Sequence, residues 1–328
     1  MPVKKMIGTF GALLASALYL GHAPAFAGEG VRPAGPIGGT DINQALLPPP
    51  GLYGAVVDVT TALTGFFNHD ASITTSSGLD LVGGAGLLYV YDTTLFGGAL
   101  ASSVFLGADR LCFKVNNVFD RCSVGQQDIY SDVLMWSRFF PIVDASAQPS
   151  GLPPIPYGLA VMAGMSVVAP TGVYDRENNI NVGSNVWDIA PNLALTYTVP
   201  SIFGPTFGQA TQFSVRAWLN NYTENPATKY QSGTVLSIDF AMSQVYNDYQ
   251  FGIAGTTFFQ LNADEINGLE VGNYGNRARL FSLGPIVSRK FVFIDRPYEF
   301  AIKGLISTWG TNTIRADALI VRLSTKLF

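Results

Sequence analysis

Few residues of this chain have the side-chain chemistry of a catalytic site. The chain has two histidines, His22 and His69, and His69 stands beside Asp70 in a polar stretch. A hydrolase built on a Ser–His pair needs a serine within hydrogen-bond reach of its histidine, and the sequence places none. Zinc chemistry needs several His or Cys ligands together, which are also missing. We therefore expect no catalytic residue, no metal site and no cofactor, and we interpret His69 as a solvated loop residue.

The two cysteines, Cys112 and Cys122, stand ten residues apart in a stretch, 109–127, that we interpret as a loop. In an exported protein this spacing favours a local disulfide. A metal site would need further ligands, and a redox site would need a closer pair. A glycine-rich stretch, 82–86, lacks the Lys-Ser/Thr pair and the helix of a phosphate-binding loop, so strand packing is the better interpretation.

The elements that would position any site are indicated by a long alternating stretch at 187–199. Its odd positions, among them Trp187, Leu193 and Tyr197, are apolar, and its even positions, among them Asp188 and Asn192, are polar or small. Alternation with a period of two is typical of a strand. A soluble strand usually has about 5–6 residues, whereas a tilted strand that crosses a bilayer has about 9–11.

The composition agrees with a membrane protein that crosses the bilayer with strands. Only 13% of the residues are charged and 48% are hydrophobic, against roughly 25% charged in an ordinary soluble domain. Beyond the N-terminus, no apolar run has the roughly 20 residues of a transmembrane helix. A large soluble β-protein would share this composition. The net charge of −4 gives no basic footprint for nucleic acid, so no nucleic-acid partner is expected.

The N-terminus has the pattern of an export signal. Residues 1–27 combine Lys4 and Lys5, an apolar core and the small-residue site Ala25-Phe26-Ala27, which predicts a signal peptide cleaved near Ala27. An anchored N-terminal helix is the alternative. Residues 28–50 are rich in Gly and Pro, and we interpret them as an extended periplasmic lead-in. Residues 51–328 then form the barrel described next.

The alternating stretches predict an all-β chain, a transmembrane antiparallel β-barrel of about twelve strands. The expected strands are 51–66, 81–91, 95–108, 128–140, 157–169, 187–199, 211–221, 232–244, 250–261, 277–292, 298–308 and 313–328. Longer polar connections, including 68–80 and 109–127, alternate with shorter ones, as in an outer-membrane barrel. A closed sheet also leaves no backbone edge unpaired in lipid. We therefore expect the outer membrane of a Gram-negative bacterium and contact with its lipid.

Charged and aromatic residues opposite the apolar faces are the candidates for lining the lumen, because a charge that faces lipid is costly. They are Asp58, Asp132, Trp136, Arg138, Asp188, Arg216, Trp218, Asp239, Phe258, Glu299 and Lys303. The charges either brace the barrel as internal ion pairs or line a permeation path. The aromatic residues either fill space or stack with aromatic solutes. About twelve strands predict a narrow lumen, between the filled interior of about eight strands and the open channel of 16–18.

Residues 171–200 and 220–244 resemble a known family in the order and spacing of their residues, and the resemblance extends over nearly the whole mature chain, from Pro-Pro-Gly-Leu-Tyr at 49–53 onward. The matching positions include Gly172, Tyr174, Asp175, Asn185, Trp187, Pro191, Asn220, Thr223, Tyr230, Ser232, Gly233 and Asp239, with Gly255, Gln260, Asp264, Arg277 and Gly284-Pro285 further on. They resemble the outer-membrane proteins of the meta-cleavage pathway of phenol degradation. The resemblance implies a β-barrel channel for hydrophobic or aromatic compounds. The final residue, Phe328, is typical of outer-membrane barrels and implies the barrel-assembly machinery as a partner.

These observations predict a channel for the passive uptake of small hydrophobic or aromatic solutes. The first alternative is a structural or surface-interaction barrel with an occluded lumen. The second alternative is a lipid-modifying enzyme of the outer membrane, which the shortage of histidines disfavours.

Overall fold

The computed structural model describes residues 37–115, 121–142, 155–178 and 180–328. The signal peptide expected at 1–27 and the first part of the lead-in lie outside the described residues. Among the described residues, no helix is long and apolar enough to cross a membrane.

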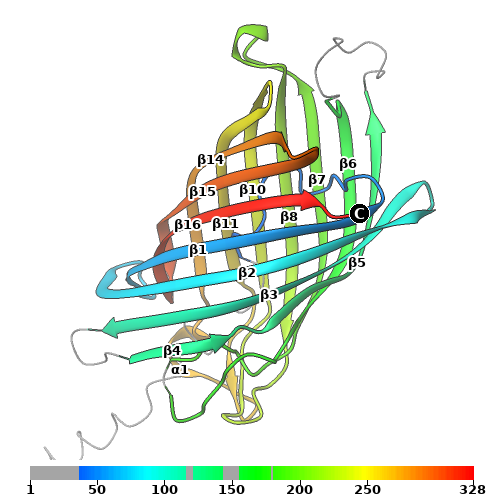
Figure 1. Ribbon diagram of the computed structural model, residues 1–328. Coiled ribbons are helices and arrows are strands. Elements are labelled where there is room, and N and C mark those ends of the chain that lie inside the picture. The colour runs from blue at the N-terminus through cyan, green and yellow to red at the C-terminus, as the bar shows by residue number, and fades with distance from the viewer. Residues whose placement is uncertain (1–36, 116–120, 143–154, 179) are drawn as a thin grey trace, which may run out of the picture.

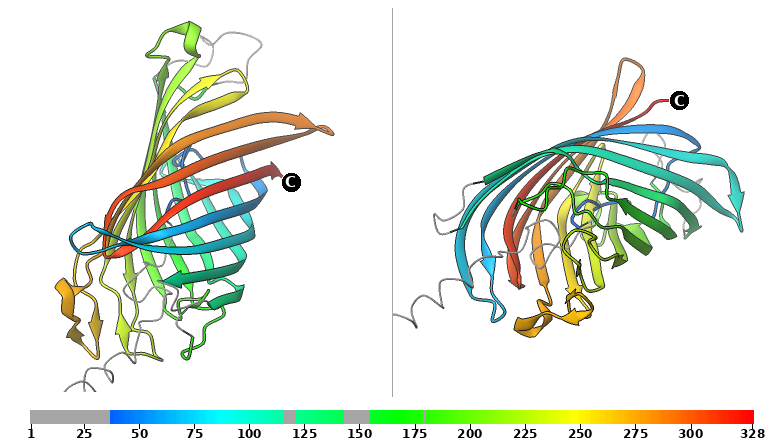
Figure 2. Two further views of the ribbon diagram at one scale, coloured as in Figure 1. Left: turned by 90° about the vertical axis from the view of Figure 1, so that its left-hand side faces the viewer. Right: turned by 90° about the horizontal axis from the view of Figure 1, so that it is seen from below.

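Twelve long strands close into one antiparallel barrel, as the alternating sequence predicts (Figure 1). They are β1 (Gly51–Phe67), β2 (Ile73–Leu95), β3 (Gly98–Val115), β5 (Ile129–Pro141), β6 (Gly158–Ala169), β7 (Asp188–Pro200), β8 (Ala210–Tyr222), β10 (Val235–Tyr246), β11 (Tyr249–Gln260), β14 (Arg279–Phe293), β15 (Arg296–Thr311) and β16 (Thr313–Lys326). Each strand pairs with its neighbours in the sequence, and β1 pairs with β16, which closes the ring. The strands β14 to β16 and β1 to β3 are strongly inclined to β5 to β8 (Figures 1 and 2).

The connections separate the two ends of the barrel. We call the end with residues 170–187, 223–234 and 261–278 the loop end, and the end with Gly51 and Phe328 the turn end. Short elements lie between the long strands: β4 (Arg121–Gln126), β9 (Tyr230–Gln231), β12 (Glu265–Ile266), β13 (Leu269–Glu270), the single-turn helix η2 (Pro205–Phe207) and α1 (Gly272–Gly275). At the turn end, Leu52 exchanges backbone hydrogen bonds with Phe328, so the last residue of the chain is tied to the first strand.

The strand β7 shows why this sequence forms a membrane barrel. Its outward residues Ile189, Leu193 and Leu195 are 47%, 65% and 44% exposed, whereas Asp188 and Asn192 are buried. An apolar outer belt and a polar interior are the reverse of a soluble protein and are typical of a strand between lipid and a lumen. The apolar face of this strand therefore points outward, as predicted.

Two stretches that the sequence presents as loops are strands in the structure. The prediction of a loop at 68–80 is wrong beyond residue 72, because β2 begins at Ile73 and pairs with the end of β1. The prediction of a loop at 109–127 is also wrong in large part, since β3 continues to Val115 and pairs with β4. Both stretches are polar, but β2 and β3 have 23 and 18 residues and extend past the apolar band of a barrel, which is about 25 Å tall. Beyond that band a strand needs no apolar face, so polarity there does not indicate a loop.

The disulfide predicted between Cys112 and Cys122 is present, and it joins directly opposite residues of β3 and β4. The strand β4 pairs with β3 alone, so the two form an extension of the barrel wall at the loop end. The disulfide links the two strands of this β3–β4 extension covalently. A disulfide that closes a loop of about ten residues stabilises it by roughly 2–3 kcal/mol.

We expect Cys112→Ser/Cys122→Ser to loosen the β3–β4 extension without unfolding the barrel. Limited proteolysis should cut the double variant within residues 109–126 well before the oxidised protein. Heat-modifiable gel migration should stay the same, because the long strands of the barrel do not depend on the bond. Equal resistance of the two proteins to cleavage would contradict this role.

A β-bulge changes which residues of β5 face the lumen. Its register with β6 shifts between Asp132 and Leu134. Asp132 and Met135 are therefore both buried inside, and Trp136 and Arg138 point outward. The prediction that these last two line the lumen is wrong, because strict alternation was carried across a position where one extra residue reverses the parity.

The strand β1 also has its faces exchanged relative to the prediction. Val57 pairs with Arg322, whose guanidinium reaches the interior, so Val57 points inward and Asp58 points outward. Asp58 is exposed on the outer face of the barrel, and its assignment to the lumen is wrong. The prediction assigned charged residues to the lumen because a charge that faces lipid is costly. It fails at Asp58 because the inner face of β1 is more apolar than the outer face that carries this residue.

Candidate functional site

The lumen contains residues 37–48, which we call the lumen segment. The dark-blue chain ahead of β1 runs between the strands from the loop end to the turn end, where β1 begins (Figure 2). Ala45 packs among Met135, Met162 and Ala194 nearer the turn end, and Ile37 packs on Tyr222 and Phe258 at the loop end. The sequence predicts that residues 28–50 form an extended periplasmic lead-in. The structure instead places residues 37–48 of that stretch inside the barrel.

The backbone of the lumen segment is hydrogen-bonded by side chains of the barrel wall. The amides of Gly38 and Thr40 donate to the two carboxylate oxygens of Asp239, each at 2.9 Å. Further along, the amides of Asn43, Gln44 and Ala45 donate to Gln212 Oε1, Ser214 Oγ and Thr196 Oγ1, each at 3.0 Å. A buried backbone without strand partners must find side-chain partners. The polar residues of the lumen supply them.

Gly38 starts this run of contacts with a backbone conformation that favours glycine. Its φ is +71°, and a Cβ there would lie 2.9 Å from Leu305 Cδ1. A glycine at this position lets the chain turn against the wall so that its amide reaches Asp239.

An ion cluster fixes the centre of the lumen segment. Lys303 Nζ lies 3.2 Å from Asp41 Oδ2 and donates to the carbonyl oxygens of Gly38 and Thr40, each at 2.8 Å. Arg322 lies 3.6 Å from Asp41 Oδ1 and 3.4 Å from Glu299 Oε1. Lys303 and Asp41 are almost completely buried. Because a buried charge needs a partner, each of them depends on the other.

A second network braces the wall without touching the lumen segment. Arg216 Nη2 lies 2.6 Å from Asp132 Oδ1 and 2.9 Å from Asn192 Oδ1. Asp132 also accepts hydrogen bonds from the hydroxyls of Ser166 and Tyr130. The guanidinium carbon of Arg216 lies 4.7 Å from the centre of the Trp218 ring. The network spans β5 to β8 and occupies space inside the barrel, so it acts as a brace.

The residues that the sequence assigns to the lumen thus fall into three groups. The following are buried on the inner wall: Asp132, Asp188, Arg216, Trp218, Asp239, Phe258 and Lys303. Glu299 is half-buried near the turn end, beside Arg322. Asp58, Trp136 and Arg138 lie on the outer face, where Trp136 Nε1 and Arg138 Nη1 donate to the carbonyl oxygens of Leu95 and Phe96.

Sequence reasoning missed Asp41 and Arg322, two members of the ion cluster. Arg322 alternates with Val321 and Leu323 inside a strand, and that pattern was a usable signal for an inward charge. Asp41 stands in a Gly- and Pro-rich stretch without periodicity, and nothing local marks it as a lumen residue. Its role depends on contacts with residues about 260 to 280 positions away in the chain.

The loops of the loop end are tied together by a few polar residues, several of which carry the family resemblance. Asp264 accepts hydrogen bonds from Tyr230 Oη at 2.5 Å, from the amide of Gly233 at 2.8 Å and from Gln260 Nε2 at 2.6 Å. Burial raises the pKa of the Asp264 carboxyl above its ordinary value, and these hydrogen bonds oppose that rise. The contacts join loop 223–234 to loop 261–278, so this rim of the barrel is built as one unit.

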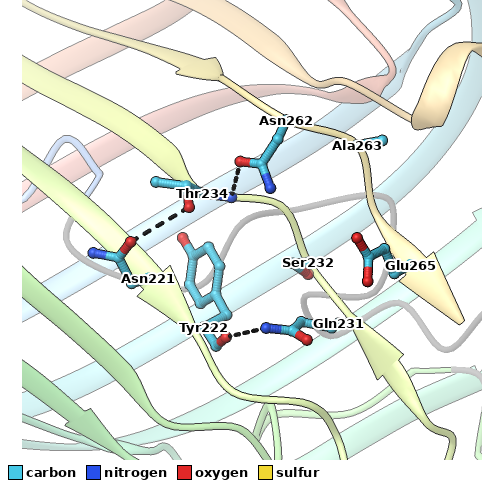
Figure 3. A pocket seen from close by; sticks show the side chains of 8 residues that line it. All are labelled: Asn221, Tyr222, Gln231, Ser232, Thr234, Asn262, Ala263 and Glu265. Atoms are coloured by element: carbon cyan, nitrogen blue, oxygen red, sulfur yellow. Dashed lines mark hydrogen bonds between the residues drawn. The ribbon is translucent and has the colours of Figure 1, made fainter. Parts of the chain in front are cut away.

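A small polar hollow lies beside this junction (Figure 3). It is lined by Asn221, Tyr222, Gln231, Ser232, Thr234, Asn262, Ala263 and Glu265. Its volume of about 210 Å³ is below the 300–1,000 Å³ typical of small-molecule sites, and its lining is mostly polar. The hollow therefore does not fit an apolar solute. Within the described chain, no group of three or more His, Cys, Asp or Glu residues is placed to hold a metal ion.

Comparison with known proteins places this barrel in a family. A family model described as the putative MetA-pathway of phenol degradation matches residues 81–323. A COG4313 outer membrane channel from Pseudomonas putida F1 shares the fold, with a TM-score of 0.66 and 15% sequence identity over 85% of this chain and 96% of that chain.

Weaker likenesses extend to other barrels and carry no argument here. The β-domain of the Bordetella autotransporter BrkA has a TM-score of 0.42 at 9% identity, covering 85% of this chain and 100% of that one. The transport unit of the autotransporter AIDA-I from Escherichia coli has a TM-score of 0.41 at 10% identity, covering 87% and 94%. No curated protein matches the chain by sequence. With the family model covering most of the barrel, the chain belongs to the family of the putative MetA-pathway of phenol degradation.

Proposed function

We propose that this protein is an outer-membrane channel through which small hydrophobic or aromatic solutes diffuse passively. The observation that carries the proposal is the division of the lumen into two unlike walls. The hydrogen bonds of the lumen segment go to the polar wall formed by β5, β7, β8, β10, β11 and β15. The opposite wall is apolar and remains accessible.

The apolar wall is formed by inward residues of β1, β2, β3 and β16. They are Ala55, Val57, Val59, Gly84, Gly86, Phe105, Ala318 and Ile320, and each is partly exposed. Their inward direction follows from their cross-strand pairing: Val57 pairs with Arg322 and with Gly84, and Ile320 pairs with Lys303. A solute without charge loses little when it moves along such a surface, whereas ions and sugars find no polar partners there.

The family and the P. putida channel of the same fold support a channel function. Lipid-modifying chemistry has no comparable support among the described residues, where His69 is exposed in the turn at 68–72. A barrel closed by its lumen segment is the second candidate, and the hydrogen bonds that tie this segment to the wall favour it. Solute flux separates the two candidates.

A charge on the apolar wall should block this path. We expect Val57→Asp to lower the flux of toluene several-fold, because it places a charged and hydrated group, opposite Arg322, on the route of an apolar solute. Flux should be measured in vesicles with lipopolysaccharide in the outer leaflet, since plain phospholipid lets small aromatic molecules through. Val57→Leu is the matched control and should leave the flux close to that of the unmodified protein.

If the unmodified protein does not raise toluene flux above that of empty vesicles, the channel proposal fails and the closed barrel is favoured. If Val57→Asp and Val57→Leu behave alike, the route lies elsewhere in the barrel.

A further inference from the structure

Three buried polar residues of the inner wall have atoms without a hydrogen-bond partner in the described part of the chain. The atoms without a partner are both carboxylate oxygens of Asp188, Nε1 of Trp218 and Oδ1 of Asn220. All three side chains have zero exposure to solvent. An unsatisfied buried polar group costs about 1–3 kcal/mol, so a group of them needs an explanation.

These groups lie on one patch of the wall. Trp218, Asn220 and Tyr222 follow each other at alternate positions of β8, so they share the inner face at a spacing of about 7 Å. Asp188 of β7 stands directly opposite Tyr222. One hydrogen-bond donor, Trp218 Nε1, and acceptors of two side chains therefore line the same side of the lumen at the loop end.

The patch also has an apolar aromatic part. Tyr222, Val235 and Phe258 are buried together, and Phe258 is aligned with Trp218 through Ser237 across β10. Ile37 of the lumen segment packs against this group. Ile37 precedes the first anchored amide, that of Gly38. It can therefore leave the patch while Asp239 and Lys303 still hold the rest of the segment.

We propose that this patch is a binding subsite for a small aromatic solute with a hydroxyl group, which takes the place of Ile37. The hydroxyl oxygen accepts a hydrogen bond from Trp218 Nε1, and its proton is donated to Asn220 Oδ1, two residues along β8. The ring packs on Phe258 and Tyr222. A hydroxyl both donates and accepts, so it satisfies groups of both kinds in the patch. This subsite deepens the proposed channel function, on which it rests.

The neighbouring charges favour a neutral hydroxyl over a charged group. Arg216 already stacks on Trp218, with 4.7 Å between the guanidinium carbon and the ring centre, so a second cation would be repelled there. A carboxylate solute would meet the carboxyl group of Asp188. A hydrocarbon such as toluene would leave the polar atoms of the patch unpaired.

The indole N–H signals of the protein can test the subsite directly. The chain has four tryptophans, and Trp218→Phe identifies the signal of Trp218 in the NMR spectrum of the ¹⁵N-labelled protein in nanodiscs. Addition of 4-fluorophenol should move the Trp218 signal downfield, as a new hydrogen bond requires. The other three indoles serve as internal references. Addition of 4-fluorotoluene, which lacks the hydroxyl, should leave the Trp218 signal in place.

Two variants sharpen this test. Asn220→Leu removes the acceptor and should weaken 4-fluorophenol binding by about tenfold; heat-modifiable migration should confirm that this variant folds without the hydrogen bonds of Asn220 Nδ2 to Val235 and Ser237. Ile37→Ala should strengthen the binding, because the solute then displaces less. Unchanged affinity in both variants overturns the proposal.

The outcomes keep the subsite separate from the channel. An equal shift with both solutes, or a shift with neither, overturns the hydroxyl subsite even if toluene crosses the barrel. A shift with 4-fluorophenol alone supports the subsite, and if toluene flux is then absent, only the channel proposal fails.

Discussion

Replacement of Lys303 by methionine should release the lumen segment and raise the ion conductance of the barrel several-fold. The Lys303 ammonium contacts the carboxylate of Asp41 and two backbone carbonyls of the segment. Methionine fills most of the same space but donates no hydrogen bond. The only cation left within 4 Å of the Asp41 carboxylate in the described chain would then be Arg322, at 3.6 Å. Removal of one partner of a buried ion pair costs about 3–5 kcal/mol, which shifts a two-state equilibrium by a factor of a hundred or more.

Two measurements read out this release. Single-channel recordings in planar bilayers report conductance, and maleimide labelling of Ile42→Cys reports access to the segment, because Ile42 is buried in the closed state. Lys290→Met is the matched control, since Lys290 is an exposed lysine of the neighbouring strand β14. Heat-modifiable migration should confirm that each variant has folded. Unchanged conductance together with unchanged labelling would show that the ion cluster does not hold the segment.

The second large effect concerns the brace around Arg216. Arg216→Met should lower the free energy of unfolding by about 3–5 kcal/mol, because it leaves the carboxylate of Asp132 buried without its cation. The ion pair has an N–O distance of 2.6 Å, and both side chains are nearly inaccessible to solvent. The double variant Arg216→Met/Asp132→Leu should recover most of this loss, since apolar replacement of both partners is often neutral.

Urea unfolding of the barrel in lipid vesicles measures these changes. Lys229→Met is the matched control, because Lys229 and Glu224 form an exposed ion pair at 3.1 Å in loop 223–234. An exposed pair contributes at most about 1 kcal/mol. A double variant as unstable as Arg216→Met would mean that the remaining hydrogen bonds of Asp132 matter more than its charge.

The two networks have different consequences for function. The Lys303 cluster joins the wall to the lumen segment, so in the proposed channel we expect its strength to set how firmly that segment is held. The Arg216 network joins wall to wall, so its strength sets the stability and shape of the barrel. Of the two alternatives that the sequence leaves open for its inward charges, both networks agree with the brace, because their charges are held in ion pairs and hydrogen bonds.

The sequence by itself determined the architecture, because lipid imposes a local rule on every strand. A residue that faces lipid must be apolar, and its neighbours along the strand face the other way. The alternation in β7, β8 and β10 therefore predicted the barrel and the inward positions of Asp188, Arg216 and Asp239. The pair Cys112 and Cys122 could also be matched from spacing alone, since both lie in one short stretch.

Only the tertiary structure decided which side of β1 and of the second half of β5 faces the lumen. One bulged residue after Asp132 reverses the parity of Trp136 and Arg138. In most strands the outer face is apolar and the inner face is polar. In β1 the inner face is apolar, and the charged residue Asp58 lies on the outer face. The position of residues 37–48 likewise depends on Asp239, Lys303 and Arg322, which are about 200 residues or more away in the chain. Such contacts have no local pattern, because they exist only once the barrel has closed around the segment.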